Sequence, residues 1–229
     1  MKLLAAKSVE THDLTRRYGY RVALRKVSIG FPTQGIHGLF GSNGAGKTTL
    51  MRVISTLLRP HGGTVSVLGF SPQEEPEEVK KRIGIVGDKA LLYEELTGFE
   101  NLRFYSKLYG LDQQFFESQV EELTDRFAIK TWLKEPVKNL STGLKKRFDI
   151  VRSLTHNPEL LLLDEPFSGL DKDTTDVFWE YLNEYRTLRT TIVTTHNLEY
   201  GAALCDEYVT LRKGVVVSQG PISEFDQTL

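Results

Sequence analysis

Residues 41–48 read GSNGAGKT and match the phosphate-loop pattern G-x-x-x-x-G-K-[ST] at every defined position. Glycines let such a loop curl so that its backbone N–H groups point toward phosphate oxygens. An apolar segment at residues 36–40 precedes the loop, and residues 49–54 read as the first turns of a helix, whose N-terminus attracts anions. This order of strand, loop and helix predicts an α/β fold that binds a nucleoside triphosphate.

Two side chains of the loop add to the backbone groups. Lys47 supplies a positive charge for the β- and γ-phosphates, and the Thr48 hydroxyl can hold Mg²⁺. A chance glycine-rich turn is the alternative, and the complete pattern in this context argues against it. The candidate phosphate-binding residues are Gly41, Ser42, Asn43, Gly44, Ala45, Gly46, Lys47, Thr48 and Thr49.

Composition limits the classes of protein to consider. A chain of 229 residues can bury one sizeable core, or one core with an inserted subdomain. Its 29 Lys and Arg nearly balance 30 Asp and Glu, so we expect no nucleic-acid partner. The single cysteine, Cys205, excludes an internal disulfide and a cysteine-based zinc site, which suits a reducing compartment.

The hydropathy of the chain indicates whether it can enter a membrane. No apolar run approaches the roughly 20 residues that span a bilayer. Residues 1–7 are too short and too soon charged to read as a signal peptide. We therefore expect a soluble chain that reaches a membrane only through a partner.

Periodicity predicts the order of the elements. Strands are expected at residues 22–31, 36–40, 64–68, 83–86, 160–163 and 191–195, and a hairpin at residues 208–219. Helices are expected at residues 100–109, 112–127, 142–155, 173–188 and 198–204, and the acidic run at residues 73–78 reads as a solvated helix start. The uniformly apolar residues 160–163 indicate a strand buried on both faces of a parallel sheet.

Asp164 and Glu165 follow that buried strand directly. The carboxyl ends of strands are where open α/β sheets bind ligands. Asp164 would hold Mg²⁺, directly or through water, and Glu165 would polarise the attacking water as general base. An acidic pair that only caps the next turn is the alternative, but the phosphate loop earlier in the chain favours catalysis.

One helix before this strand, residues 140–147 read LSTGLKKR. With this segment in place, the order of motifs resembles the ATP-binding cassette (ABC) ATPases over essentially the whole chain. Ser141 and Gly143 match the family signature, commonly LSGGQ, whereas Thr142 and Leu144 depart from it. The resemblance implies that Ser141 and Gly143 contact the γ-phosphate of ATP bound by an opposite subunit. Alone, Ser141 is only a good helix N-cap.

Further positions match the family's pattern. Residues 168–171 resemble the loop that lines its dimer interface, and His196 resembles its switch histidine, which contacts the γ-phosphate. Tyr18 matches the aromatic residue that stacks on adenine, with Tyr20 as a competitor and Val22 supporting the base from the side. A packed surface aromatic or a structural histidine is the alternative in each case.

One departure concerns the loop after residues 83–86. The family usually has glutamine there, in contact with Mg²⁺ and with the membrane partner, whereas this chain has Asp88. An acid can reach a metal or its water, so the predicted metal-binding residues are Thr48, Asp164 and Asp88. A surface turn is the alternative for Asp88.

The resemblance implies a P-loop NTPase fold, as one ABC nucleotide-binding domain over residues 1–229 with an antiparallel β subdomain. Its ATPase core would comprise about residues 1–87 and 155–229, and a helical subdomain would be inserted at about residues 88–154. It implies ATP and Mg²⁺ as ligands and Glu165, His196 and Lys47 as the catalytic group. The partners would be a second ATPase subunit, most simply another copy, and a separate permease that holds the chain at the cytoplasmic face of the membrane.

Residues 82–105 carry a narrower resemblance, to the ATPase of the haem exporter used in cytochrome c maturation. Exporters of drugs, polysaccharides or sodium share much of this segment. The competing function is a soluble ABC ATPase of translation or DNA repair, although the chain has neither a second cassette nor a long coiled-coil insertion. Thr142 and Leu144 also leave a non-hydrolysing regulator open, against which Glu165 and His196 argue.

Overall fold

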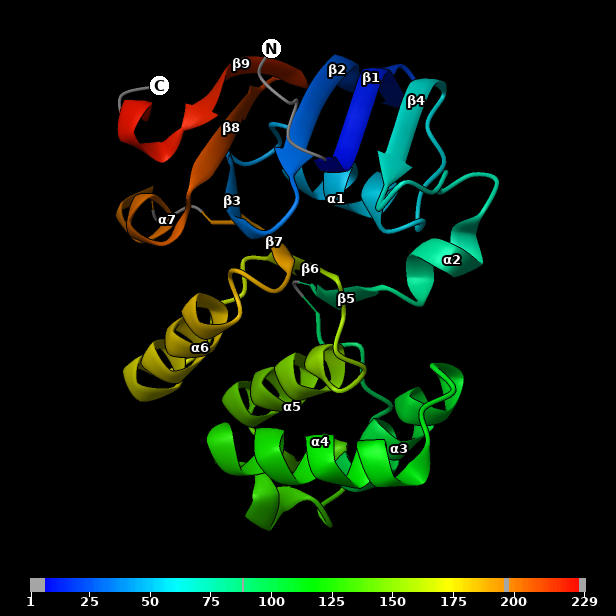
Figure 1. Cartoon of the computed structure of the whole chain (residues 1–229), viewed down its shortest axis with the longest axis vertical. Coiled ribbons are helices and arrows are strands. Elements are labelled where there is room, and N and C mark those ends of the chain that lie inside the picture. Colours follow the sequence, from blue (N-terminus) through cyan, green and yellow to red (C-terminus); the bar gives the residue numbers. More distant parts are fainter. Residues whose placement is uncertain (1–6, 88, 196–197, 227–229) are drawn as a thin grey trace.

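The computed structural model describes residues 7–87, 89–195 and 198–226, which form two sheets (Figure 1). A three-stranded antiparallel sheet has the order β2-β1-β4, and a six-stranded sheet has the order β5-β6-β7-β3-β8-β9. In the larger sheet only β9 runs antiparallel to its neighbour. The strands are β1 (Lys7–Tyr18), β2 (Arg21–Pro32), β3 (Gly35–Phe40), β4 (Gly62–Val67), β5 (Ile83–Val86), β6 (Leu160–Asp164), β7 (Thr190–Thr194), β8 (Glu207–Arg212) and β9 (Val215–Pro221).

Some helices pack against the larger sheet, and others form a separate group at one end of the molecule (Figure 1). Three of them, α3 to α5, follow β5 in the chain, precede β6 and gather at the end of the molecule opposite the antiparallel sheet (Figure 1). No helix in the described part of the chain is both long and apolar enough to cross a membrane. The helices are α1 (Lys47–Ile54), α2 (Pro76–Lys80), α3 (Gly98–Leu108), α4 (Gln113–Arg126), α5 (Thr142–Leu154), α6 (Lys172–Glu184) and α7 (Leu198–Leu204).

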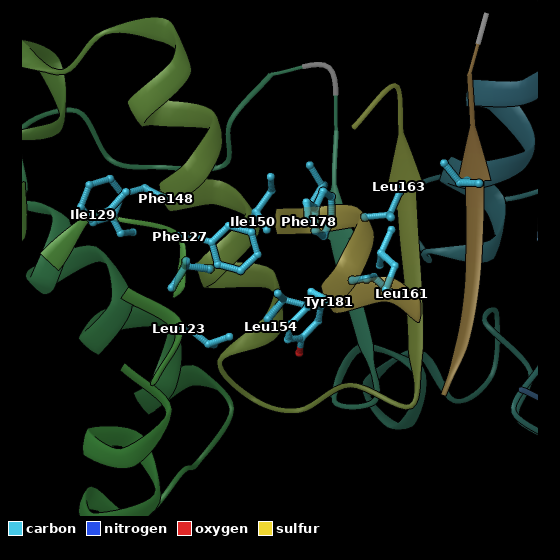
Figure 2. Packing of buried hydrophobic residues seen from close by; sticks show 14 of the residues in the cluster. Leu123, Phe127, Ile129, Phe148, Ile150, Leu154, Leu161, Leu163, Phe178 and Tyr181 are labelled. Atoms are coloured by element: carbon cyan, nitrogen blue, oxygen red, sulfur yellow. The ribbon is translucent and has the colours of Figure 1, made fainter. Parts of the chain in front are cut away.

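The leucine run of β6 lies at the centre of the fold and faces both sides of the sheet. Leu161 and Leu163 belong to the core shared with the helices and lie on the side of Phe178 and Tyr181 of α6 (Figure 2). Leu160 and Leu162 pack on the opposite face, in the core that α1 and the antiparallel sheet share. Successive side chains of a strand point to opposite faces, so an unbroken apolar run is what a strand covered on both faces requires. The prediction for residues 160–163 is confirmed.

Strand β1 is the element that the sequence analysis missed, although it is the middle strand of its sheet. Its period-2 pattern is interrupted because Asp13 has a φ of 49° and the pairing with β2 shifts register between Thr11 and Leu14. The bulge leaves two consecutive polar residues, His12 and Asp13, exposed, and this breaks the alternation by which a strand is recognised.

Helix α6 is shorter than the predicted helix at residues 173–188. It ends at Glu184, and Tyr185 is its C-cap. The chain then turns to enter β7 at Thr190, and in this turn Arg189 Nη2 donates to Asn157 Oδ1 at 2.9 Å. The chain must reverse direction here to reach the parallel strand, and this overrides the helical pattern.

A test of the packing concerns Gly84, where β5 passes close to the end of α5. A Cβ atom at Gly84 would clash with the backbone oxygen of Ser153 and lie 2.9 Å from Leu161 Cδ1. We expect Gly84→Ala to lower the free energy of unfolding by about 1–3 kcal/mol, the usual cost of overpacking, as measured by urea denaturation. Gly62→Ala is the matched control, since nothing lies within 4 Å of the new atom. Equal stability of the two variants would contradict this packing.

Candidate functional site

Three adjacent parallel strands bring the predicted phosphate loop and the predicted acidic pair to one edge of the sheet. Strand β7 lies between β6 and β3 in the sheet, so the loops that follow these strands meet. Asp164, the last residue of β6, accepts hydrogen bonds from Thr48 Oγ1 at 2.8 Å and from Thr194 Oγ1 at 2.5 Å. Residues that are more than a hundred positions apart in the sequence therefore form one cluster.

The phosphate loop has the backbone conformation that requires its glycines. Gly41, Gly44 and Gly46 have φ values of 139°, 78° and 116°, in a region that residues with a Cβ atom seldom adopt. A Cβ atom at Gly41 would also clash with the backbone oxygen of Leu211. Gly46 is the N-cap of α1 and provides no side-chain cap, which leaves the first N–H groups of that helix for an anion.

Lys47, the first residue of α1, extends back over the loop. Its Nζ donates to the carbonyl oxygens of Gly41 at 2.7 Å and Ser42 at 3.3 Å, and only 7% of the residue is exposed. The ammonium group is thus held beside the loop that is predicted to carry the phosphates, in a partly desolvated position where its charge is weakly screened.

A pocket of about 320 Å³ lies over the loop. Nine predicted site residues line it, namely Tyr18, Asn43, Gly44, Gly46, Lys47, Thr48, Thr49, Asp164 and Glu165. The lining does not include Gly41, Ser42, Ala45 or Val22. It does include Arg21 and Ala23, which the sequence analysis did not single out.

Period-2 alternation explains why Arg21 and Ala23 line the pocket in place of Val22. Arg21 pairs with Tyr18 across the antiparallel pair of strands, and Ala23 shares its face of β2, whereas Val22 points to the other face. The distance between Arg21 Nη2 and a Cβ built on Gly44 would be 3.3 Å, so the guanidinium lies over the phosphate loop. The alternation in residues 21–23 could have revealed this, had the pairing with β1 been known.

Glu165 follows Asp164 directly and lines the same pocket. Its φ is 51°, in the left-handed region, and its N–H donates to the backbone oxygen of Thr194 at 3.2 Å and to the hydroxyl of Thr194 at 3.1 Å. This backbone turns the residue away from the strand direction. Glu165 also lines a second pocket, of about 520 Å³, on the side of α5.

Ser141 and Gly143 lie at the start of α5, where Ser141 is the N-cap and accepts a hydrogen bond from the N–H of Leu144 at 3.3 Å. Neither residue lines the phosphate-loop pocket. Their neighbour Thr142 instead lines the second pocket, together with Ser168 and Gly169. Within one chain the structure therefore does not bring the signature segment to the phosphate loop.

Asp171 connects the loop at residues 168–171 to helix α5. It caps α6 by accepting from the N–H of Thr174 at 2.8 Å, and Arg147 Nη2 of α5 donates to it at 2.5 Å. The hydrogen bond from Thr174, supported by Arg147, lowers the pKa of the Asp171 carboxyl to about 2, so the group stays ionised at neutral pH.

Two predicted residues, His196 and Asp88, lie outside the described part of the chain. Among the described residues, no group of three or more His, Cys, Asp or Glu side chains could hold a metal ion. Mg²⁺ commonly takes one or two protein oxygens and completes its shell with water and substrate phosphates. Thr48 and Asp164, whose oxygens are 2.8 Å apart, are of this kind.

Comparison with known proteins gives the family. The family model described as ABC transporter matches residues 24–168, which contain the phosphate loop, the signature segment and the acidic pair. The chain belongs to this family. It is an ABC transporter ATP-binding subunit and an ATPase.

Relatives agree over most of the chain. It is 36% identical to the ABC transporter ATP-binding protein NatA of Bacillus subtilis, over 87% of this chain and 82% of the relative. It is 33% identical to the daunorubicin/doxorubicin resistance ATP-binding protein DrrA of Streptomyces peucetius, over 100% of this chain and 70% of the relative.

Solved structures share the fold. An ATP-binding subunit of an ABC transporter superposes with a TM-score of 0.89 at 30% identity, covering 94% of this chain and 90% of that one. The ATP-binding cassette MJ0796, solved as a dimer bound to ADP and Pi, gives a TM-score of 0.85 at 22% identity and covers 95% of this chain and all of that one. The predicted ABC-type fold is confirmed.

Proposed function

We propose that this ATPase binds Mg²⁺-ATP in the phosphate-loop pocket and drives a separate membrane permease. The convergence of Lys47, Thr48, Asp164 and Glu165 in one pocket carries the proposal. Lys47 and the loop N–H groups would hold the phosphates, Thr48 and Asp164 the Mg²⁺, and Glu165 the attacking water. Catalysis would consist mainly of positioning and charge stabilisation, so that the rigid loop and strand ends supply most of it.

A second subunit would complete the site. Ser141 and Gly143 lie outside the phosphate-loop pocket of their own chain, as they must if they contact ATP bound by a partner. ATP would then join two copies, and hydrolysis would separate them. His196 would contact the γ-phosphate, and Asp88 would supply a further ligand to the metal or its water, as the resemblance implies.

The permease would dock beside this site, between α1 and the segment that follows β5. A pocket of about 310 Å³ there is lined by Arg52, Leu57, Gly87 and Leu91 among others. Leu57 and Leu91 are 64% and 42% exposed, and Tyr93 and Phe104 form an exposed edge-to-face pair with centroids 4.9 Å apart. Exposed apolar groups of this kind, with a cation among them, suit a cytoplasmic helix of a membrane protein and would keep the chain at the inner face of the membrane.

We propose export of a drug-like amphipathic compound as the direction and cargo, because the relatives include ATPases named for daunorubicin and doxorubicin resistance. Haem is the second candidate cargo, favoured by the resemblance of residues 82–105 to the haem exporter ATPase. The ATPase itself holds no cargo in this proposal, and nucleic acid is not a partner.

Purification of the chain from mild-detergent extracts of its own cell, followed by mass spectrometry, tests the proposal. We expect a multi-span permease to co-purify with the wild-type chain and to be lost with Leu57→Asp. It should be retained with Leu188→Asp, since Leu188 is 72% exposed but does not line the pocket that contains Leu57. Ribosomal or DNA-repair proteins in place of a permease would contradict it. With the permease in vesicles, stimulation of ATP hydrolysis by daunorubicin or by haem separates the two cargoes.

The adenine contact can be tested by a pair of tyrosines. Tyr18 lines the pocket and is 44% exposed, whereas the side chain of Tyr20 is fully exposed and does not line the pocket. We expect Tyr18→Ala to raise the Kd for ATP by about 5-fold, equivalent to roughly 1 kcal/mol of base stacking, and Tyr20→Ala to leave it unchanged. Titration with a fluorescent ATP analogue measures both. An equal effect of the two variants would refute the assignment of Tyr18.

A further inference from the structure

A buried lysine joins α5 to the turns that follow β5 and β6. Lys146 lies in the first turns of α5, and only 7% of it is exposed. Its Nζ donates to the carbonyl oxygen of Gly87 at 3.0 Å and lies 3.5 Å from the carbonyl oxygen of Glu165. Gly87 directly precedes Asp88 in the sequence. One ammonium group therefore contacts Glu165, proposed to orient the attacking water, and the residue that precedes Asp88, proposed to act on the metal.

The backbone of Glu165 is held from two sides. Its φ of 51° is unfavourable for a residue with a Cβ atom, and such residues persist only where the surroundings determine their conformation. On one side, the N–H of Glu165 donates to Thr194 of β7. On the other side, the carbonyl oxygen accepts from the N–H of Ser168 at 3.3 Å and faces Lys146. These contacts fix both peptide groups beside Glu165 and hence the direction of its side chain.

The contact between Lys146 and Glu165 is long for a hydrogen bond between neutral groups. The interaction is therefore mainly the attraction between the charged ammonium and the carbonyl dipole, which solvent screens weakly at a buried site. Lys146 is buried to this degree, and its shorter bond to Gly87 holds the ammonium in place.

The same helix connects this lysine to the proposed subunit interface. Helix α5 begins at Thr142, with Ser141 as its N-cap, so Lys146 lies about one turn from the residues proposed to contact the partner's ATP. We propose that Lys146 is a positioning residue: it holds Glu165 in its hydrolytic orientation and links that orientation to the placement of the start of α5. This inference rests on the proposed role of Glu165 in hydrolysis.

Substitution of Lys146 should change kcat for ATP hydrolysis and leave KM nearly unchanged. We expect Lys146→Met to lower kcat for ATP hydrolysis about 10-fold, because small displacements of a catalytic group are costly, and to change KM less than about 2-fold. Lys146→Arg should restore most of kcat. Lys138→Met is the matched control: Lys138 lies outside α5 and the pocket at Glu165, its side chain is 50% exposed, and it pairs with Glu95 at 2.7 Å. We expect its kcat to stay within about 2-fold of wild type.

A double-mutant cycle decides whether Lys146 acts through Glu165. The kcat of Lys146→Met combined with Glu165→Gln should equal that of Glu165→Gln alone, measured in single-turnover reactions. If the double variant loses kcat by the product of the two single-variant losses, the proposal is overturned. An unchanged kcat in a folded Lys146→Met or Lys146→Gln variant would also overturn it. Wild-type turnover in Glu165→Gln would instead overturn the role of Glu165 itself, so the two failures are distinguishable.

Discussion

Replacement of Glu165 by glutamine is expected to slow ATP turnover by about 10²- to 10⁴-fold, the usual contribution of a general base. The amide has the shape of the carboxylate but cannot take a proton from the attacking water. The backbone bonds of Glu165 to Thr194 do not involve the side chain, so the fold and the phosphate loop should be unaffected. A steady-state phosphate-release assay measures the change.

The same variant should bind ATP with wild-type affinity and accumulate as an ATP-bound dimer, which size-exclusion chromatography with ATP and without it would detect. Glu184→Gln is the matched control, because Glu184 lies at the surface, far along the chain from the site, and forms an ion pair with Arg126 at 2.7 Å. Undiminished turnover in Glu165→Gln would show that another group polarises the water.

Replacement of Lys47 by alanine is expected to weaken ATP binding about 10- to 150-fold, since a hydrogen bond to a charged group contributes roughly 1.5–3 kcal/mol. The effect should be large because Lys47 is nearly buried, and solvent cannot replace its ammonium group efficiently. Isothermal titration with ATP measures it.

Lys80→Ala is the control for loss of a lysine, because Lys80 forms an exposed ion pair with Glu77. A melting curve of Lys47→Ala should accompany the titration, since Gly41 and Ser42 lose a hydrogen-bond donor to their carbonyl oxygens. Unchanged ATP affinity in the folded variant would refute the phosphate-loop assignment.

Local patterns were sufficient to predict the elements whose surroundings are uniform. The apolar run at residues 160–163 became β6 because both of its faces are covered, and the hairpin at residues 208–219 became β8 and β9 around Lys213 and Gly214, which both have positive φ. Helix α4 likewise begins after Asp112, whose side chain caps it. In each case a short segment carries the information that its own conformation needs.

The sequence by itself determined the chemistry of the site, because a phosphate loop and a strand-end acidic pair are local arrangements of backbone and side chain. Only the tertiary structure decided what surrounds them. Because of the bulge at Asp13, the sequence pattern did not predict β1. The pairing of β1 with β2, which places Arg21 at the pocket, was therefore not predicted either. The contact of Lys146 with Glu165 depends on how α5 packs beside β5 and β6. Strand pairing and helix packing join residues distant in the chain, and no periodicity within a segment records them.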